Sequence, residues 1–112
     1  MYGIKEIDAA TLARWLGEGR AIRLLDVRSP AEFAQGAIPG GELTPLHLLP
    51  LRAGELDPGA VTVLYCRSGA RSAQACMFLQ QQIGMQEAYN LRGGIIDWVR
   101  QGHPVVRPDA AA

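Results

Sequence analysis

A cysteine followed closely by two arginines has the clearest chemical potential in this sequence. Cys66 ends the apolar run VTVLYC and precedes the polar segment RSGARS, which contains Arg67 and Arg71. A loop between a strand and a helix leaves backbone N–H groups without intrahelical partners, and these groups can converge on one anion. The arginine charges and the helix N-terminus favour thiolate over thiol. The pattern therefore predicts a nucleophilic cysteine in an anion-binding loop.

The other residues of this loop fit the same chemistry. Gly69 removes a side chain where the backbone must curl close to a ligand, and Ser68 and Ser72 offer hydroxyl donors. We expect both arginines to attract and orient a doubly charged anion, but Arg71 could instead turn inward and brace the loop, and both uses remain open. With Cys66 as the nucleophile, the predicted binding residues are Arg67, Ser68, Gly69, Ala70 and Arg71.

Both cysteines also have a purely structural interpretation. Cys66 could be a small apolar residue at the end of a strand. Cys76 shares the apolar face of the predicted next helix with Leu79 and Ile83, so we expect a core thiol there and not a resolving cysteine. A disulfide between the two cysteines would need Cα atoms within about 7 Å, which a strand end and a site well along the next helix do not favour.

Strand and helix patterns alternate along the chain. Short apolar runs predict strands over 21–27, 42–44, 60–66 and 87–91. Helical spacing, caps and Pro30 predict helices over 9–19, 30–36, 71–84 and 94–102, and the Pro- and Gly-rich segment 37–59 predicts loop with one helical turn. Because helices supply the crossovers that parallel strands need, we expect an α/β fold with a mostly parallel sheet and helices on both faces. Ligands bind at the carboxyl ends of such strands, where Cys66 lies.

Composition and charge limit the possible partners. The 112 residues are 48% hydrophobic, which suits one domain, and we expect it to span 1–107 with a short flexible tail at 108–112. Lys and Arg total 11, as do Asp and Glu, so the net charge of zero predicts no nucleic acid and no membrane partner. The N-terminal MYGIKEIDAATLARWL, with its charged helix-like segment, lacks the apolar core of a signal peptide, so a cytoplasmic location is expected. His47 and His103 have no second ligand at metal spacing, so no metal site is predicted.

Three ordered blocks of the sequence resemble the rhodanese-like sulfurtransferases, and the resemblance extends from Ile7 to Val106. LLDVRSPAEFAQGAIPGG resembles the family's Asp-Val-Arg strand end, its Glu-Phe/Tyr helix and its Ile-Pro-Gly turn. YCRSGARS resembles the active-site loop, and YNLRGGIIDWVRQGHPV resembles the terminal Leu-x-Gly-Gly, Trp and Gly-x-Pro pattern. The usual histidine before Ile-Pro-Gly is Ala37 here. The resemblance implies a rhodanese-like fold with a five-stranded sheet.

The resemblance also implies sulfur transfer in two covalent steps, without a cofactor or a metal. A Cys66 persulfide would form from a small-molecule sulfur donor such as thiosulfate, and cyanide, a thiol or a partner protein would accept the sulfur. Loop amides would stabilise the persulfide charge. Asp26 and Arg28 match family positions and are expected to be structural, pairing with their surroundings or with Glu32, and Ser72 is expected to support the loop. Nothing in the sequence predicts a dimer, so a monomer is the default expectation.

Three other functions fit parts of the pattern. Cysteine-dependent phosphatases share the arrangement of strand, loop and helix but place five residues between cysteine and arginine, whereas four lie between Cys66 and Arg71. The same difference disfavours the related arsenate reductases. An interaction module that has lost turnover is a second alternative, although such modules typically lack the cysteine. The third alternative is a sulfur carrier that uses protein persulfides. The two arginines favour a doubly charged small-molecule donor, but the sequence leaves the sulfur carrier open as an alternative.

Overall fold

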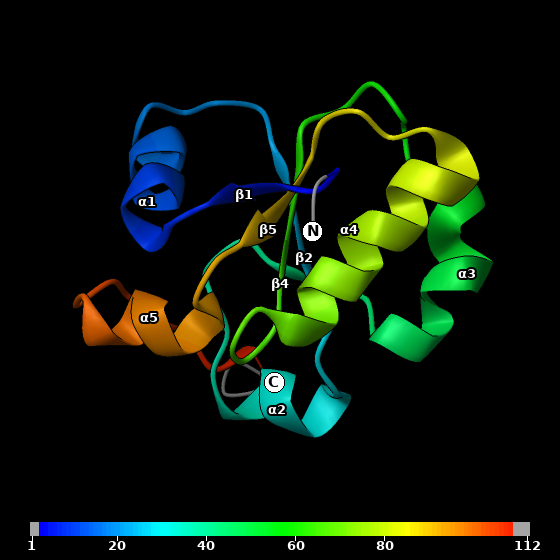
Figure 1. The fold of residues 1–112 in the computed structure, drawn as a ribbon. Helices are drawn as coiled ribbons and strands as arrows, with labels where there is room; N and C mark the ends of the chain where they lie inside the picture. Colours follow the sequence, from blue (N-terminus) through cyan, green and yellow to red (C-terminus); the bar gives the residue numbers. More distant parts are fainter. Residues whose placement is uncertain (1–2, 109–112) are drawn as a thin grey trace.

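Strands and helices alternate along the chain (Figure 1). The computed structural model describes residues 3–108. The strands are β1 (Lys5–Ile7), β2 (Arg23–Asp26), β3 (Glu42–Leu43), β4 (Thr62–Tyr65) and β5 (Ala88–Leu91). The helices are α1 (Ala9–Gly17), α2 (Pro30–Gln35), α3 (Leu49–Arg52), α4 (Ala70–Ile83) and α5 (Gly94–Arg100), with short 3-10 helices η1 (Leu46–Leu48) and η2 (Ala53–Glu55) on either side of α3.

The five strands form one sheet in the order β1-β5-β4-β2-β3, and every neighbouring pair is parallel. The central strand β4 is buried along its whole length, as expected for a parallel strand that is covered on both faces. Helices α3 and α4 lie on one side of the sheet, and α1 and α5 lie on the other (Figure 1). The predicted α/β fold with helices on both faces is confirmed, and the sheet within the described residues is parallel throughout.

Alternate residues of the central strands build two cores, one on each face of the sheet. Leu25 and Leu64 belong to the core beneath α3 and α4, which also contains Cys66. Leu24 and Val63 belong to the core beneath α1 and α5. Successive side chains of a strand point to opposite faces, so each strand contributes to both cores. Strand β4, which directly precedes Cys66, is therefore held from both sides.

Two parts of the fold differ from the prediction. Residues 5–7 form strand β1, where the sequence indicated only a helix-like segment, because parallel pairing with β5 supplies hydrogen bonds that no local pattern reveals. The segment 46–55 forms η1, α3 and η2 in succession, where one helical turn was expected. Leu49 and Ala53 are buried there against the core beneath α4, which stabilises this helical run despite its proline and its glycine.

The C-terminal segment returns to the body of the fold. Val106 and Ala37 form an isolated antiparallel bridge, in which each N–H donates to the other residue's carbonyl at 2.8 Å. Of the tail predicted at 108–112, residues 109–112 lie outside the described part of the chain. Within residues 3–108, none of the helices has the length and apolar character needed to cross a membrane.

Candidate active site

The Cys66 side chain lies directly after β4, at the carboxyl edge of the sheet, and it is buried. The Gly69 N–H donates to Sγ at 3.1 Å, and the Ser72 hydroxyl oxygen lies 3.4 Å from the same sulfur. Gly69 has φ 104°, in the left-handed region that favours glycine, and this conformation turns its N–H toward the sulfur. The predicted loop therefore curls around the thiol at the start of α4.

Opposing effects set the pKa of the Cys66 thiol. Burial raises the pKa, whereas hydrogen bonds from the Ser72 hydroxyl and from the backbone N–H groups of Ser72, Gly69 and Ser68 lower it. The lowering effects are larger together, so the pKa lies below the ordinary value of a cysteine. The thiolate, which is the nucleophilic form, is correspondingly favoured.

The second cysteine and the histidines lie outside this loop. Cys76 is buried on α4, and burial together with the charge of Glu6 raises the pKa of its thiol to about 12, in keeping with the predicted core thiol. Both cysteines are free thiols. His47 is exposed on η1, and the His103 ring packs on Trp98 with ring centres 4.6 Å apart. In the part of the chain that the structure describes, no group of three His, Cys, Asp or Glu residues is placed to hold a metal ion.

Arg71 is held by helix α2. Its Nη1 and Nη2 donate to Oε1 and Oε2 of Glu32 at 2.8 and 2.9 Å. Glu32 also completes a capping box, because its Oε1 accepts the Ser29 N–H at 2.9 Å while the Ser29 hydroxyl oxygen accepts the Glu32 N–H. Of the two uses left open for Arg71, this contact is a bracing one, and it joins α4 to α2 beside the loop. Arg67, in contrast, is exposed on the loop.

A buried ion pair fixes the end of the neighbouring strand β2. Arg28 donates to the Asp26 carboxylate through Nε at 2.9 Å and through Nη2 at 2.6 Å, and Nη2 also donates to the Gly36 carbonyl at 2.7 Å. Both side chains are buried. The two residues therefore pair with each other, and the Glu32 alternative does not occur, because the Glu32 carboxylate binds Arg71. The contact with Gly36 ties β2 to the end of α2.

The N-terminus of α5 packs directly on the loop that follows Cys66, a contact that the sequence did not predict. The N–H groups of Ile95 and Ile96 donate to the carbonyls of Cys66 and Arg67 at 3.0 and 3.2 Å. Gly94 has φ 59°, and a Cβ atom there would overlap the Arg67 carbonyl group. The double glycine before α5 was a signal for this close approach, but the sequence alone does not show which backbone it meets.

Asn90, on β5, contacts the loop from within the sheet. Its Nδ2 donates to the Gly69 carbonyl at 3.2 Å and to Oε2 of Glu6 at 2.9 Å. The Ser72 hydroxyl donates to Asn90 Oδ1 across 2.5 Å. Sequence reasoning missed Asn90 and Glu6, because a single amide in one strand and a single carboxylate in another carry no motif that marks them as neighbours.

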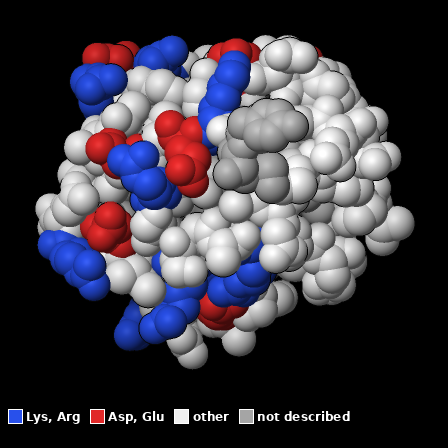
Figure 2. Space-filling model, in the orientation of Figure 1, with Lys and Arg blue, Asp and Glu red and all other residues white. Residues whose placement is uncertain are grey.

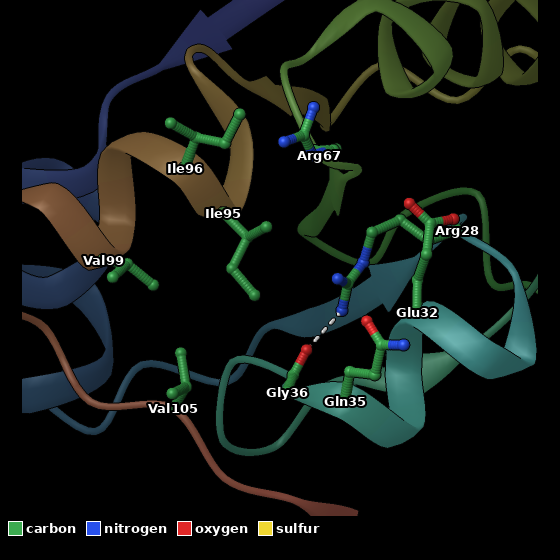
Figure 3. A pocket seen from close by; sticks show the side chains of 9 residues that line it. All are labelled: Arg28, Glu32, Gln35, Gly36, Arg67, Ile95, Ile96, Val99 and Val105. Carbon is green, nitrogen blue, oxygen red and sulfur yellow. Dashed lines mark hydrogen bonds between the residues drawn. The ribbon is translucent and has the colours of Figure 1, made fainter.

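A groove of about 430 Å³ runs beside the loop (Figure 3). Its apolar wall consists of Ile95, Ile96 and Val99 from α5 and of Val105, and its polar wall consists of Arg28, Glu32, Gln35 and Gly36. Arg67 extends from the loop at one end of the groove (Figure 3). Val99 is 51% exposed and Val105 is 43% exposed, so the apolar wall is open to solvent. The groove offers space for a ligand much larger than one sulfur atom.

Charged side chains are mixed on the face of the molecule that Figure 2 shows, where blue and red groups lie next to one another. Surface ion pairs such as Lys5–Glu87 and Arg23–Glu42 join opposite charges at 3.2 and 2.7 Å. The side over α3 and α4 shows few charges in this view. On this face, attraction for an anion therefore depends on local groups and not on a broad basic surface.

Comparison with known proteins identifies one family. The family model of the rhodanese-like domain matches residues 8–101. A sulfurtransferase of Allochromatium vinosum is 48% identical over 106 residues, which cover 95% of this chain and 98% of that protein. A putative sulfur carrier protein of Bacillus subtilis is 30% identical over 95 residues, or 85% of this chain and 51% of that protein. The crystal structure of a rhodanese-related protein from Thermoplasma volcanium has a TM-score of 0.82 at 33% identity, covering 91% of this chain and 97% of that one. The chain therefore belongs to the rhodanese-like domain family, as the resemblance of its three sequence blocks predicted.

Proposed function

We propose that this protein is a thiosulfate sulfurtransferase that carries the transferred sulfur as a persulfide on Cys66. The observation that carries the proposal is the placement of the Cys66 sulfur within 3.1 Å of the Gly69 N–H, in a loop that lowers the pKa of the thiol despite its burial. Fixed neutral donors of this kind stabilise a thiolate before the reaction and sulfur-borne charge after it. The family membership supports sulfur transfer in general, and thiosulfate as donor is the proposed refinement.

The reaction consists of two displacements at sulfur. The Cys66 thiolate attacks the outer sulfur of thiosulfate, the sulfur–sulfur bond of the donor breaks, and sulfite leaves with the bonding electron pair. In the second step an acceptor nucleophile attacks the outer sulfur of the persulfide and regenerates the thiolate. Cyanide would leave as thiocyanate, and a thiol would leave as a new persulfide. Each step conserves atoms and charge, so no oxidant, metal or cofactor is required.

The loop residues have distinct roles in this proposal. The exposed Arg67 attracts the dianionic donor, and Ser68 and Ala70 form the exposed rim that the donor meets. Gly69 supplies the N–H that bonds the sulfur. Arg71 contributes positive charge near the thiol while its guanidinium remains bound to α2.

Intact mass spectrometry before and after thiosulfate tests the proposal. The wild type should gain one sulfur atom, Cys66→Ser should gain none, and the matched control Cys76→Ser should behave as the wild type. Cyanide should discharge the added sulfur and release thiocyanate in equal amount. A wild-type protein that gains no sulfur from thiosulfate would refute thiosulfate as the donor.

The groove favours a second candidate, a sulfur carrier that exchanges sulfur with protein thiols. Thiosulfate and cyanide need no apolar wall, whereas a peptide segment with an apolar side chain and an acidic group would contact both Val99 and Arg67. The similarity to a putative sulfur carrier protein is compatible with this use. The two candidates differ in the acceptor and share the Cys66 persulfide.

Substitution in the groove separates the candidates. Val99→Asp should slow discharge of the persulfide to a thiol-bearing peptide with an apolar and an acidic residue, and it should leave discharge to cyanide unchanged. Leu51→Asp is a matched control, because Leu51 is 79% exposed on α3, away from the groove. Equal discharge to the peptide by the wild type and Val99→Asp would count against the carrier.

A further inference from the structure

Asn90 lies where the loop, α4 and β1 meet. Its side chain is buried at the end of β5. Nδ2 donates to the Glu6 carboxylate at 2.9 Å and to the Gly69 carbonyl at 3.2 Å. An amide nitrogen carries only two hydrogens, so both are used, and this fixes the amide with Oδ1 toward Ser72.

Ser72 has one hydroxyl hydrogen and two acceptors within reach. Its Oγ lies 2.5 Å from Asn90 Oδ1 and 3.4 Å from Cys66 Sγ. Because Asn90 has no hydrogen left to offer, the hydrogen in the shorter contact belongs to Ser72. When that contact is made, Ser72 presents a lone pair to the Cys66 thiol and does not donate to the sulfur.

We propose that Asn90 is a positioning residue for sulfur transfer: it holds the Ser72 hydroxyl hydrogen while Cys66 is a thiol, and it yields that hydrogen to the sulfur when the sulfur becomes anionic. The inference rests on the proposed role of Cys66 as the nucleophile. When the thiol proton leaves to solvent, Ser72 turns about its Cβ–Oγ bond, so one hydrogen bond moves from Oδ1 to Sγ. In the persulfide, Cys66 Sγ is bonded to the transferred sulfur and no longer carries the charge, so the hydrogen returns to Oδ1 until sulfur transfer regenerates the thiolate.

Competition for this hydrogen prevents the thiolate from being stabilised too strongly. A hydroxyl that donated permanently to the sulfur would increase the fraction of thiolate, but it would also weaken the thiolate as a nucleophile, because nucleophilicity falls as the pKa falls. Asn90 therefore sets the balance between these two effects. It acts on the sulfur through Ser72, whose hydroxyl oxygen lies between Asn90 Oδ1 and Cys66 Sγ.

The charges around Cys66 should stay constant in the first test of this role. The charged side chains near the loop include Arg67 in the loop itself, Arg71 of α4, Glu32 of α2, Asp26 of β2 with Arg28 just after it, Glu6 of β1, and Asp97 of α5, which pairs with Arg100. Four of these are bound in the pairs Asp26–Arg28 and Glu32–Arg71. Substitution of Asn90 or Ser72 by an uncharged residue alters none of these charges.

The test measures the rate at which iodoacetamide alkylates Cys66 across a range of pH, with peptide mass mapping to separate Cys66 from Cys76. In Asn90→Leu the Ser72 hydrogen is free for the sulfur, so the pH midpoint of alkylation should fall by about half to one pH unit. The limiting rate at high pH should fall with it. In Ser72→Ala no hydroxyl hydrogen remains, so the midpoint should rise by a similar amount.

The double variant is the decisive comparison. Without the Ser72 hydroxyl, Asn90 has no hydrogen to hold, so Ser72→Ala/Asn90→Leu should have the midpoint of Ser72→Ala alone. The proposal is overturned if the midpoint of Asn90→Leu fails to fall. It is equally overturned if the fall is the same with and without the Ser72 hydroxyl, because Asn90 would then be a structural support only.

Glu6→Gln provides a second test that does not disturb the core, which matters if Asn90→Leu fails to fold. Glutamine retains an acceptor for Asn90 but removes a negative charge. The direct effect of that charge on the thiol is the same with and without Ser72, whereas the weaker polarisation of the Asn90 amide should add a further fall of the midpoint only when Ser72 is intact. Glu87→Gln is the matched control for the loss of a carboxylate, since Glu87 pairs with Lys5 at the surface. An unchanged midpoint in Glu6→Gln, a fall that is no larger with the Ser72 hydroxyl than in Ser72→Ala, or an equal shift in Glu87→Gln would contradict the proposal.

Alkylation requires no sulfur donor, so the result of this test does not depend on whether thiosulfate forms the persulfide. A protein that follows the predicted midpoints but gains no sulfur from thiosulfate would refute the donor and retain the role of Asn90. A protein that forms the persulfide but shows identical midpoints in all variants would refute the role of Asn90 alone.

Discussion

Replacement of Glu32 by glutamine would isolate the ion pair that joins α2 to α4. Glutamine has nearly the same size, and in a capping box it still accepts the backbone N–H of Ser29, so helix α2 keeps its cap. The change removes the negative charge that faces Arg71 at 2.8 and 2.9 Å. The free energy of unfolding should therefore decrease by the contribution of this pair.

The pKa of Glu32 sets an upper limit on that contribution. Hydrogen bonds from Arg71, opposed by burial, lower the pKa of the Glu32 carboxyl from 4.5 to about 2. Taken in full, this difference corresponds to about 3 kcal/mol. The Arg71 and Glu32 side chains are 37% and 29% exposed, so solvent screens the pair, and we expect a loss of about 1 kcal/mol near neutral pH.

The pH dependence has a definite sign. Because the pKa of Glu32 is lower in the folded than in the unfolded protein, the stabilisation is fully present above the unfolded-state pKa of 4.5 and is lost as the pH falls toward about 2. Urea unfolding of wild type and Glu32→Gln at about pH 7, 5 and 3 should show a difference that shrinks with acidity. Glu18→Gln, which opens an exposed pair with Arg14 at 3.9 Å, should change stability by less than about 0.5 kcal/mol. A Glu32→Gln protein as stable as wild type at neutral pH, or a difference that does not shrink in acid, would refute the reasoning.

Three further predictions concern the packing around the loop. Gly94→Ala should lower the free energy of unfolding by about 2 kcal/mol or more in urea titrations, because a Cβ atom at this position overlaps the Arg67 carbonyl group. Gly54→Ala is the control and should be nearly neutral, because the space around Gly54 is open, and similar losses in both variants would contradict this account. Asp26→Asn should lower the free energy of unfolding by about 3–5 kcal/mol in thermal or urea unfolding, because it leaves the Arg28 charge buried without its partner. A decrease below about 1 kcal/mol would show that the ion pair is not needed for stability. Cys76 should resist alkylation by iodoacetamide in the native protein at about pH 8 and should react after unfolding, which peptide mass mapping would show. Rapid labelling of Cys76 in the native protein would contradict its burial and the raised pKa of its thiol.

The sequence allowed the strand, loop and helix around Cys66 to be predicted because these parts are consecutive and each carries its own signal. The apolar run of β4, the glycine at position 69 and the helical spacing of α4 mark a strand, a tight loop and a helix within one short segment. Helix α4 also ends where it was predicted to end, at the left-handed Gly84. Local patterns of this kind specify the position of Cys66 without knowledge of the rest of the fold.

The remaining parts of the site depend on contacts between distant segments, and these could not be predicted. Arg71 finds its partner Glu32 39 positions earlier in the chain, so the sequence left its two uses open. Asn90 and Glu6 meet only because β1 pairs with β5. Strand β1 itself has only three residues, of which Ile7 alone is buried, too short a pattern to distinguish from a helix start.

The burial of Cys76 also determines how this protein can recover from oxidation. A thiol with a lowered pKa, such as that of Cys66, is the kind that peroxide converts to a sulfenic acid. Redox sensors repair this state with a nearby resolving thiolate, which condenses with the sulfenic acid to a disulfide. Cys76, the other cysteine of the chain, is protonated at neutral pH and enclosed in the core, so it does not serve in this way. Repair of oxidised Cys66 through a disulfide therefore requires a thiol from outside the chain.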